Sequence, residues 1–151
     1  MKTYNFSYDS SGHLTNFKKE GGSRRNKDYE LTFTWSSDKI TEITESDSES
    51  TLTLSSFEYS SKYPNVTLQY APYIEMFFAD EEQGFPMLFY LGYLGKASTY
   101  HPISFTCTYG TVEEYFYYKP TLNKDGSLKK MKQTEVASFT TSPVTYTFSY
   151  E

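Results

Sequence analysis

Cysteine is nearly absent from this chain of 151 residues, which contains only Cys107. A single thiol can form neither an internal disulfide nor a metal site that needs several cysteines. Histidine is almost as scarce, with one residue at His13 and one at His101. Neither histidine lies in a recognisable metal or nucleophile motif. We therefore expect no enzymatic activity and no cofactor.

Positive charge and long apolar runs are also scarce. The formal net charge is -5, so no affinity for nucleic acid or anionic lipid is expected. The longest apolar stretch, around Phe85 to Leu94, is too short to span a bilayer as a helix. No secretory signal opens the chain. Either the protein stays where it is made, or Met1 replaces a removed leader.

Aromatic residues, in contrast, are abundant, with 16 Tyr and 12 Phe. Near the start, YNFSYDSSGHLTNF alternates aromatic and polar residues, turns through a segment that ends at Gly12, and returns as HLTNF. This alternation is typical of a β-strand followed by a hairpin turn. On the return, Leu14 and Phe17 are three residues apart, which places them on opposite faces of a regular strand. We expect a β-bulge there, or partial cover on both faces.

The same unit occurs twice more. YELTFTW is followed by a turn and KITEI, and YFYYKPTL by a turn and SLKKM; the final YTFSYE supplies an outgoing strand alone. Further strands are expected at Thr51 to Tyr59, Asn65 to Tyr70, Ile103 to Tyr109 and Glu135 to Phe139. Residues 1–151 are therefore predicted to form one mainly β domain, an antiparallel meander of roughly ten strands that is curled or partly closed into a barrel.

One segment departs from this period. In FPMLFYLGYLG, Pro86 suits a first helical position and Gly95 the position just past a helix end. Apolar residues point in every direction around such a helix, so it must be buried on all sides. We predict a short buried helical insert near residues 73–95, lying in the concave side of the sheet against the faces that carry Tyr4, Phe6, Phe33 and Trp35.

These features together resemble a family of uncharacterised exported proteins or lipoproteins from Bacteroides-type bacteria, a domain of unknown function with a porin-like fold. The resemblance lies in YNFSYDSSGHLTNF, the terminal YTFSYE and the block NVTLQY to FFADEEQGFPMLFYLGYLGKAS. It implies a partly closed β-meander and a location in the periplasm or at the cell surface, usually behind a lipoprotein signal. This sequence shows no lipobox or leader, but the resemblance implies that the native gene encodes an export signal upstream of Tyr4. The resemblance brings no catalytic residues.

Several residues have two interpretations. Cys107 with His101 could form a thiol nucleophile pair, but the strand pattern ISFTCTY favours a buried, inert thiol. The acidic runs Glu45 to Glu49 and Asp80 to Glu82 could bind a cation such as calcium, yet they lack the spacing of a dedicated loop. A solvated connection is the preferred interpretation of both runs.

The segment EEYFYYKP suggests a binding surface. Tyr115 and Tyr117 share one strand face, while Phe116 and Tyr118 share the other. A strand with one wet face does not need aromatics on both, so Phe116 and Tyr118 are candidates for an exposed platform that binds a glycan or an envelope protein. The simpler interpretation is that loops or the helical insert cover Phe116 and Tyr118. We therefore predict a non-catalytic binding module of the cell envelope; the alternatives are a scaffold component of an envelope assembly and a carrier of a small apolar ligand.

Overall fold

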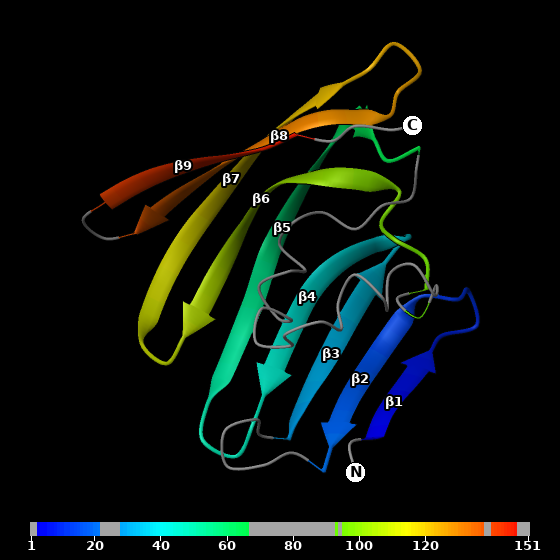
Figure 1. Cartoon of the computed structure of the whole chain (residues 1–151), viewed down its shortest axis with the longest axis vertical. Helices are drawn as coiled ribbons and strands as arrows, with labels where there is room; N and C mark the ends of the chain where they lie inside the picture. Colours follow the sequence, from blue (N-terminus) through cyan, green and yellow to red (C-terminus); the bar gives the residue numbers. More distant parts are fainter. Residues whose placement is uncertain (1–2, 22–27, 67–92, 94, 138–139, 148–151) are drawn as a thin grey trace.

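The computed structural model of the chain describes residues 3–21, 28–66, 93, 95–137 and 140–147. These residues form one sheet of nine strands, in which the spatial order is the chain order (Figure 1). The strands are β1 (Thr3–Tyr8), β2 (Leu14–Glu20), β3 (Tyr29–Ser36), β4 (Lys39–Ser46), β5 (Thr51–Pro64), β6 (Tyr100–Tyr109), β7 (Val112–Leu122), β8 (Leu128–Ala137) and β9 (Thr140–Thr147). Every neighbouring pair is antiparallel. The predicted mainly β, antiparallel meander is confirmed.

The sheet is curled but open. Strands β1 and β9 lie at its two ends, and among the described residues they do not pair with each other (Figure 1). A closed barrel requires its first and last strands to hydrogen-bond. Among the described strands the sheet is therefore open and is not closed into a barrel.

Each repeated hairpin contains a β-bulge on its returning strand. The pairing skips Thr15 between β1 and β2, Thr41 between β3 and β4, and Lys129 between β7 and β8. The extra residue reverses the alternation, so both apolar residues of each returning motif face the same way. All six are buried: Leu14, Phe17, Ile40, Ile43, Leu128 and Met131. The bulge expected at the first hairpin is thus confirmed, and the same device is found at the other two.

Several predicted boundaries change. SLKKM and Glu135 to Phe139 were predicted as separate strands, but Leu128 to Ala137 is continuous in β8. The strand predicted at Asn65 to Tyr70 begins with two residues outside any strand, and 67–70 lie outside the described residues. Since β5 continues to Pro64, the apolar pattern at Thr51 to Tyr59 underestimated its length.

Almost all of the predicted helical insert near residues 73–95 falls outside the described residues. Of that segment, Tyr93 and Gly95 are described, and Tyr93 stacks on Phe6 with ring centroids 5.1 Å apart. The Tyr8 hydroxyl also donates a hydrogen bond to the Tyr93 carbonyl at 2.6 Å. The described residues form strands and include no helix, so the helical insert remains a prediction. Nor does the described part of the chain include a helix of the length and apolarity needed to cross a membrane.

The two faces of the sheet differ sharply. We call the face that carries the hydrophobic core the inner face and the opposite one the outer face. The core contains side chains from seven of the strands, β2 to β8: Leu14, Phe17, Leu31, Phe33, Ile40, Ile43, Leu54, Phe105, Cys107, Phe116, Tyr118, Leu128 and Met131. Because strand residues alternate between faces, the neighbours of these residues form an outer face of mostly Ser, Thr, Lys and Tyr.

Candidate binding site

Phe116 and Tyr118, the predicted platform residues, lie on the inner face and are buried, with exposed fractions of 3% and 5%. The Phe116 ring stacks on Phe105 with centroids 4.9 Å apart. The Tyr118 hydroxyl donates a hydrogen bond to Oε1 of Gln133 at 2.8 Å. Both therefore belong to the core, because the inner face is covered, and neither is available to stack on a ligand.

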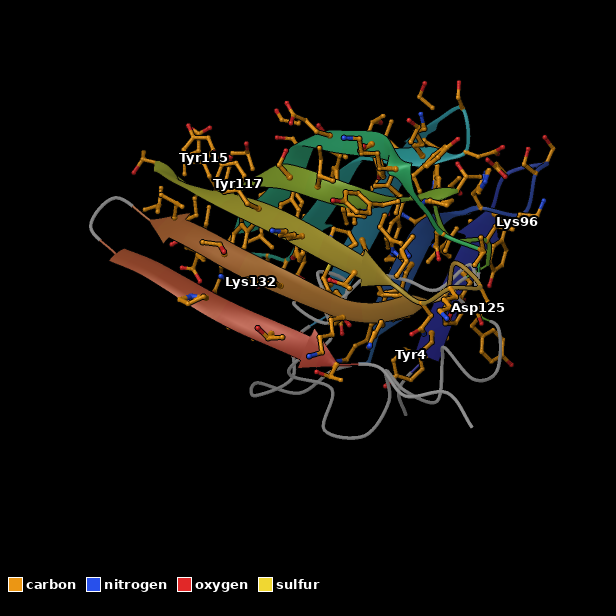
Figure 2. All side chains as sticks on the ribbon, turned by 90° about the horizontal axis from the view of Figure 1, so that it is seen from above. Tyr4, Lys96, Tyr115, Tyr117, Asp125 and Lys132 are labelled. Carbon is orange, nitrogen blue, oxygen red and sulfur yellow. The ribbon has the colours of Figure 1, made fainter. Side chains whose placement is uncertain are left out.

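The other aromatic pair of β7 is the exposed one. Tyr115 and Tyr117 lie on the outer face, with exposed fractions of 44% and 52%, and follow one another along the strand (Figure 2). The sequence contains a signal that could have identified them. Glu113 and Lys119 lie on the same strand face as the two tyrosines, and charged side chains indicate the solvent-exposed face of a strand. Pro120, which lies on the same strand face as Phe116 and Tyr118, is buried.

Small side chains surround the two tyrosines. Tyr117 is flanked by Ser104 on β6 and Thr134 on β8, while Tyr115 is flanked by Thr106 and Val136. Directly opposed strand residues have Cβ atoms roughly 5 Å apart, so these neighbours decide how accessible each ring is. Since none of the four is large, the tyrosine rings stand above a low surface of hydroxyl and methyl groups.

Two carboxylates lie near the tyrosine pair. The negative charge of Glu113, two residues before Tyr115, raises the pKa of the Tyr115 hydroxyl, with partial burial adding to the effect. Glu58 on β5 accepts a hydrogen bond from the Ser104 hydroxyl at 2.9 Å. The tyrosine end of the outer face is therefore acidic.

Lysines occupy the opposite end of the same face. Lys119 of β7 and Lys132 of β8 are directly opposed across the ladder, and Lys130 is opposed to Thr121. All three lysines are exposed. The ion pairs of the described residues involve other groups, namely His13 with two aspartates and Lys18 with Glu20.

An open groove of about 480 Å³ borders this surface at the ends of β5 and β6. Its lining consists mostly of small polar residues: Glu49, Ser50, Thr51, Thr53, Thr108, Tyr109 and Gly110. Thr108 is paired with Glu113 on β7, so the groove lies beside the tyrosine end of the outer face.

The proposed thiol pair is not assembled. Cys107 and His101 lie near opposite ends of β6. With the usual rise per strand residue, their Cα atoms are about 20 Å apart. Burial lowers the pKa of His101 to about 4, and its ring nitrogens have no hydrogen-bond partner among the described residues. Burial, together with Glu114 and Glu135, raises the pKa of the Cys107 thiol to about 11. A neutral thiol and a distant imidazole support the inert interpretation.

The first acidic run forms a turn. The Asp47 carboxylate accepts hydrogen bonds from the backbone N–H groups of Glu49 and Ser50, both at 2.7 Å. The second run, Asp80 to Glu82, lies outside the described residues. In the part of the chain that is described, no three His, Cys, Asp or Glu side chains are grouped so that they could hold a metal ion.

His13 forms a cluster that the sequence did not indicate. Its Nδ1 lies 2.9 Å from Oδ2 of Asp9, and its Nε2 lies 3.1 Å from Oδ1 of Asp38. The ring also stacks on Trp35, with centroids 4.3 Å apart. Asp9 and Asp38 belong to the turns after β1 and β3, so the buried imidazole joins two hairpin ends. With 3% of its surface exposed, His13 is a structural link rather than an accessible catalytic group.

Comparison with known proteins shows which solved structure has a similar fold. No family model matches the chain, and no curated protein matches it. Among solved structures, the chain is similar to a porin-like protein from Bacteroides uniformis ATCC 8492, with a TM-score of 0.68 and 16% sequence identity. The match covers 95% of this chain and 58% of that protein. The expected porin-like fold is thus confirmed, while membership of an exported or lipoprotein family remains a prediction.

Proposed function

We propose that this chain is a non-catalytic carbohydrate-binding module of the cell envelope, and that Tyr115 and Tyr117 on the outer face are its contact residues. The observation that carries the proposal is the exposure of two successive tyrosines on one face of a strand in the middle of a hairpin. Aromatic rings present a flat apolar face together with a polar hydroxyl, which suits a sugar ring that has C–H groups on one side and hydroxyls at its edge.

The surroundings of the tyrosines support this function. Ser104, Thr106 and Thr134 are small enough to leave the rings accessible, and the partly exposed Ser104 and Thr134 supply hydroxyl groups at the level of the sheet. The tyrosines belong to a strand that is hydrogen-bonded on both sides, so little backbone conformational entropy is lost when a ligand binds. The location in the envelope is supported by the porin-like Bacteroides neighbour, whose fold this chain shares.

Replacing both tyrosines with threonine tests the proposal. Threonine keeps the preference for a strand but removes the ring. Wild-type protein and the Y115T/Y117T variant are screened on an array of bacterial and plant glycans, and the dissociation constants of positive glycans are measured by calorimetry. We expect the variant to bind roughly tenfold to a hundredfold more weakly, since each aromatic contact contributes about 1 kcal/mol.

A matched control is Tyr4→Thr, which removes an exposed tyrosine from the edge strand β1, far from Tyr115 and Tyr117 (Figure 2). This variant should bind as the wild type does. If no glycan binds the wild type, or if Y115T/Y117T binds equally well, the carbohydrate-binding function is wrong.

A further inference from the structure

The lysines of the outer face form a group of like charges that the fold itself does not neutralise. Lys119 and Lys132 are direct partners across β7 and β8, an arrangement that destabilises a sheet because like charges repel. Lys130 extends the group along β8. Among the described residues none of the three is in an ion pair, although the whole chain has a net charge of -5. An acidic protein thus concentrates positive charge on one small area.

This area adjoins the tyrosine pair. Tyr115, Tyr117 and Lys119 are alternate residues of β7 and share its outer face. From the rise of a strand, the Cα atoms of Tyr117 and Lys119 are roughly 7 Å apart, and those of Tyr115 and Lys119 roughly 13 Å. One extended ligand lying along β7 would therefore meet two aromatic rings and then two or three ammonium groups.

The charges on the face also limit what that ligand can be. Glu113 and Glu58 lie at the tyrosine end, where they would repel a chain that has a phosphate at every residue, such as a nucleic acid. A sugar chain can present an uncharged ring face at one point and an acidic group a few ångströms further on. It therefore complements both ends of the surface.

We propose that the outer face of β7 and β8 binds an acidic polysaccharide, one whose sugar rings carry carboxylate or sulfate groups. Tyr115 and Tyr117 stack on the rings, and Lys119 and Lys132, with Lys130 beside them, bind the anionic groups. This specificity rests on the carbohydrate-binding function proposed above and assigns its ligand class.

Pairs of polymers that share a sugar backbone, of which one member carries the anionic groups, test the ligand class. Polygalacturonate oligomers are compared with their methyl esters, and dextran sulfate with dextran, by calorimetry at low and at physiological salt. The proteins are the wild type, K119Q/K132Q and, as a control, K62Q, which removes an exposed lysine from β5. We expect the wild type to bind at least one acidic polymer roughly tenfold more tightly than its neutral counterpart, with the difference reduced by salt.

The variants then separate the two proposals. K119Q/K132Q should bind the acidic polymer no more tightly than its neutral counterpart, and K62Q should behave as the wild type. Neutral and acidic polymers that bind equally well would overturn the acidic specificity and leave the carbohydrate-binding function intact. Equal binding of polyphosphate, a polyanion without sugar rings, would show that charge alone is recognised and would also overturn it. If no polymer binds, both proposals fail.

Discussion

The two faces of β7 are equally aromatic, yet they have opposite roles. On the inner face, Phe116 and Tyr118 are buried against Phe105 and Gln133. On the outer face, Tyr115 and Tyr117 are about half exposed and have small neighbours. The difference arises from what covers each face, because the chemical character of the two pairs is nearly the same.

This comparison shows how a single strand can serve both stability and binding. The inner pair holds β7 rigidly in the sheet, and this rigidity fixes the position of the outer pair. Substitutions on the two faces should therefore separate stability from binding, and the following experiments test that separation.

The largest effect is expected on the inner face. Replacing Phe116 with alanine removes a ring that is 3% exposed and stacked on Phe105, so the free energy of unfolding should fall by about 3–5 kcal/mol. Urea unfolding followed by circular dichroism measures the change, with Phe116→Leu as a milder control that leaves a smaller cavity. An unfolding curve for Phe116→Ala that overlays the wild type would show that this face is not the core.

A second effect should appear as the pH is lowered. Burial lowers the pKa of His101 from 6.5 to about 4, so the unfolded chain takes up the proton at a higher pH than the folded chain. The stability from the neutral imidazole is complete above pH 6.5, decreases as the pH falls, and reaches its full loss below pH 4. The total loss should be about 2–3 kcal/mol.

The His101→Leu variant isolates this contribution. Urea unfolding of both proteins at intervals between pH 7 and pH 4 gives the difference in their pH dependence. The wild type should lose more stability over this range than the variant does. Parallel pH profiles would mean that His101 is not buried in its neutral form.

The smallest effect on stability is expected on the outer face. Y115T/Y117T keeps two β-branched residues on an exposed strand surface, so the free energy of unfolding should change by less than about 0.5 kcal/mol. The same urea experiment checks this, and it also establishes that any loss of glycan binding comes from the missing rings. A loss of several kcal/mol would remove the distinction between the two faces.

Much of the fold follows from local patterns. Alternation and turn residues predict the three similar hairpins, and the three-residue spacing of Leu14 and Phe17 predicts the bulge that the structure contains. These features depend on interactions within a few residues, which is why one sequence can reveal them. The same reasoning failed to find the link from His13 to Asp38, because those residues come from different hairpins and meet only when the sheet forms.

The candidate site divides in the same way. The alternation in EEYFYYKP predicts a strand with two aromatic pairs, because strand periodicity is a local property of the backbone. Which pair is exposed, and which lysines accompany it, depends on the folded sheet. Packing of side chains from seven strands buries one face, and the register of β7 against β8 brings Lys119 opposite Lys132. Burial and cross-strand pairing join residues that are distant in the chain, so no local pattern specifies them.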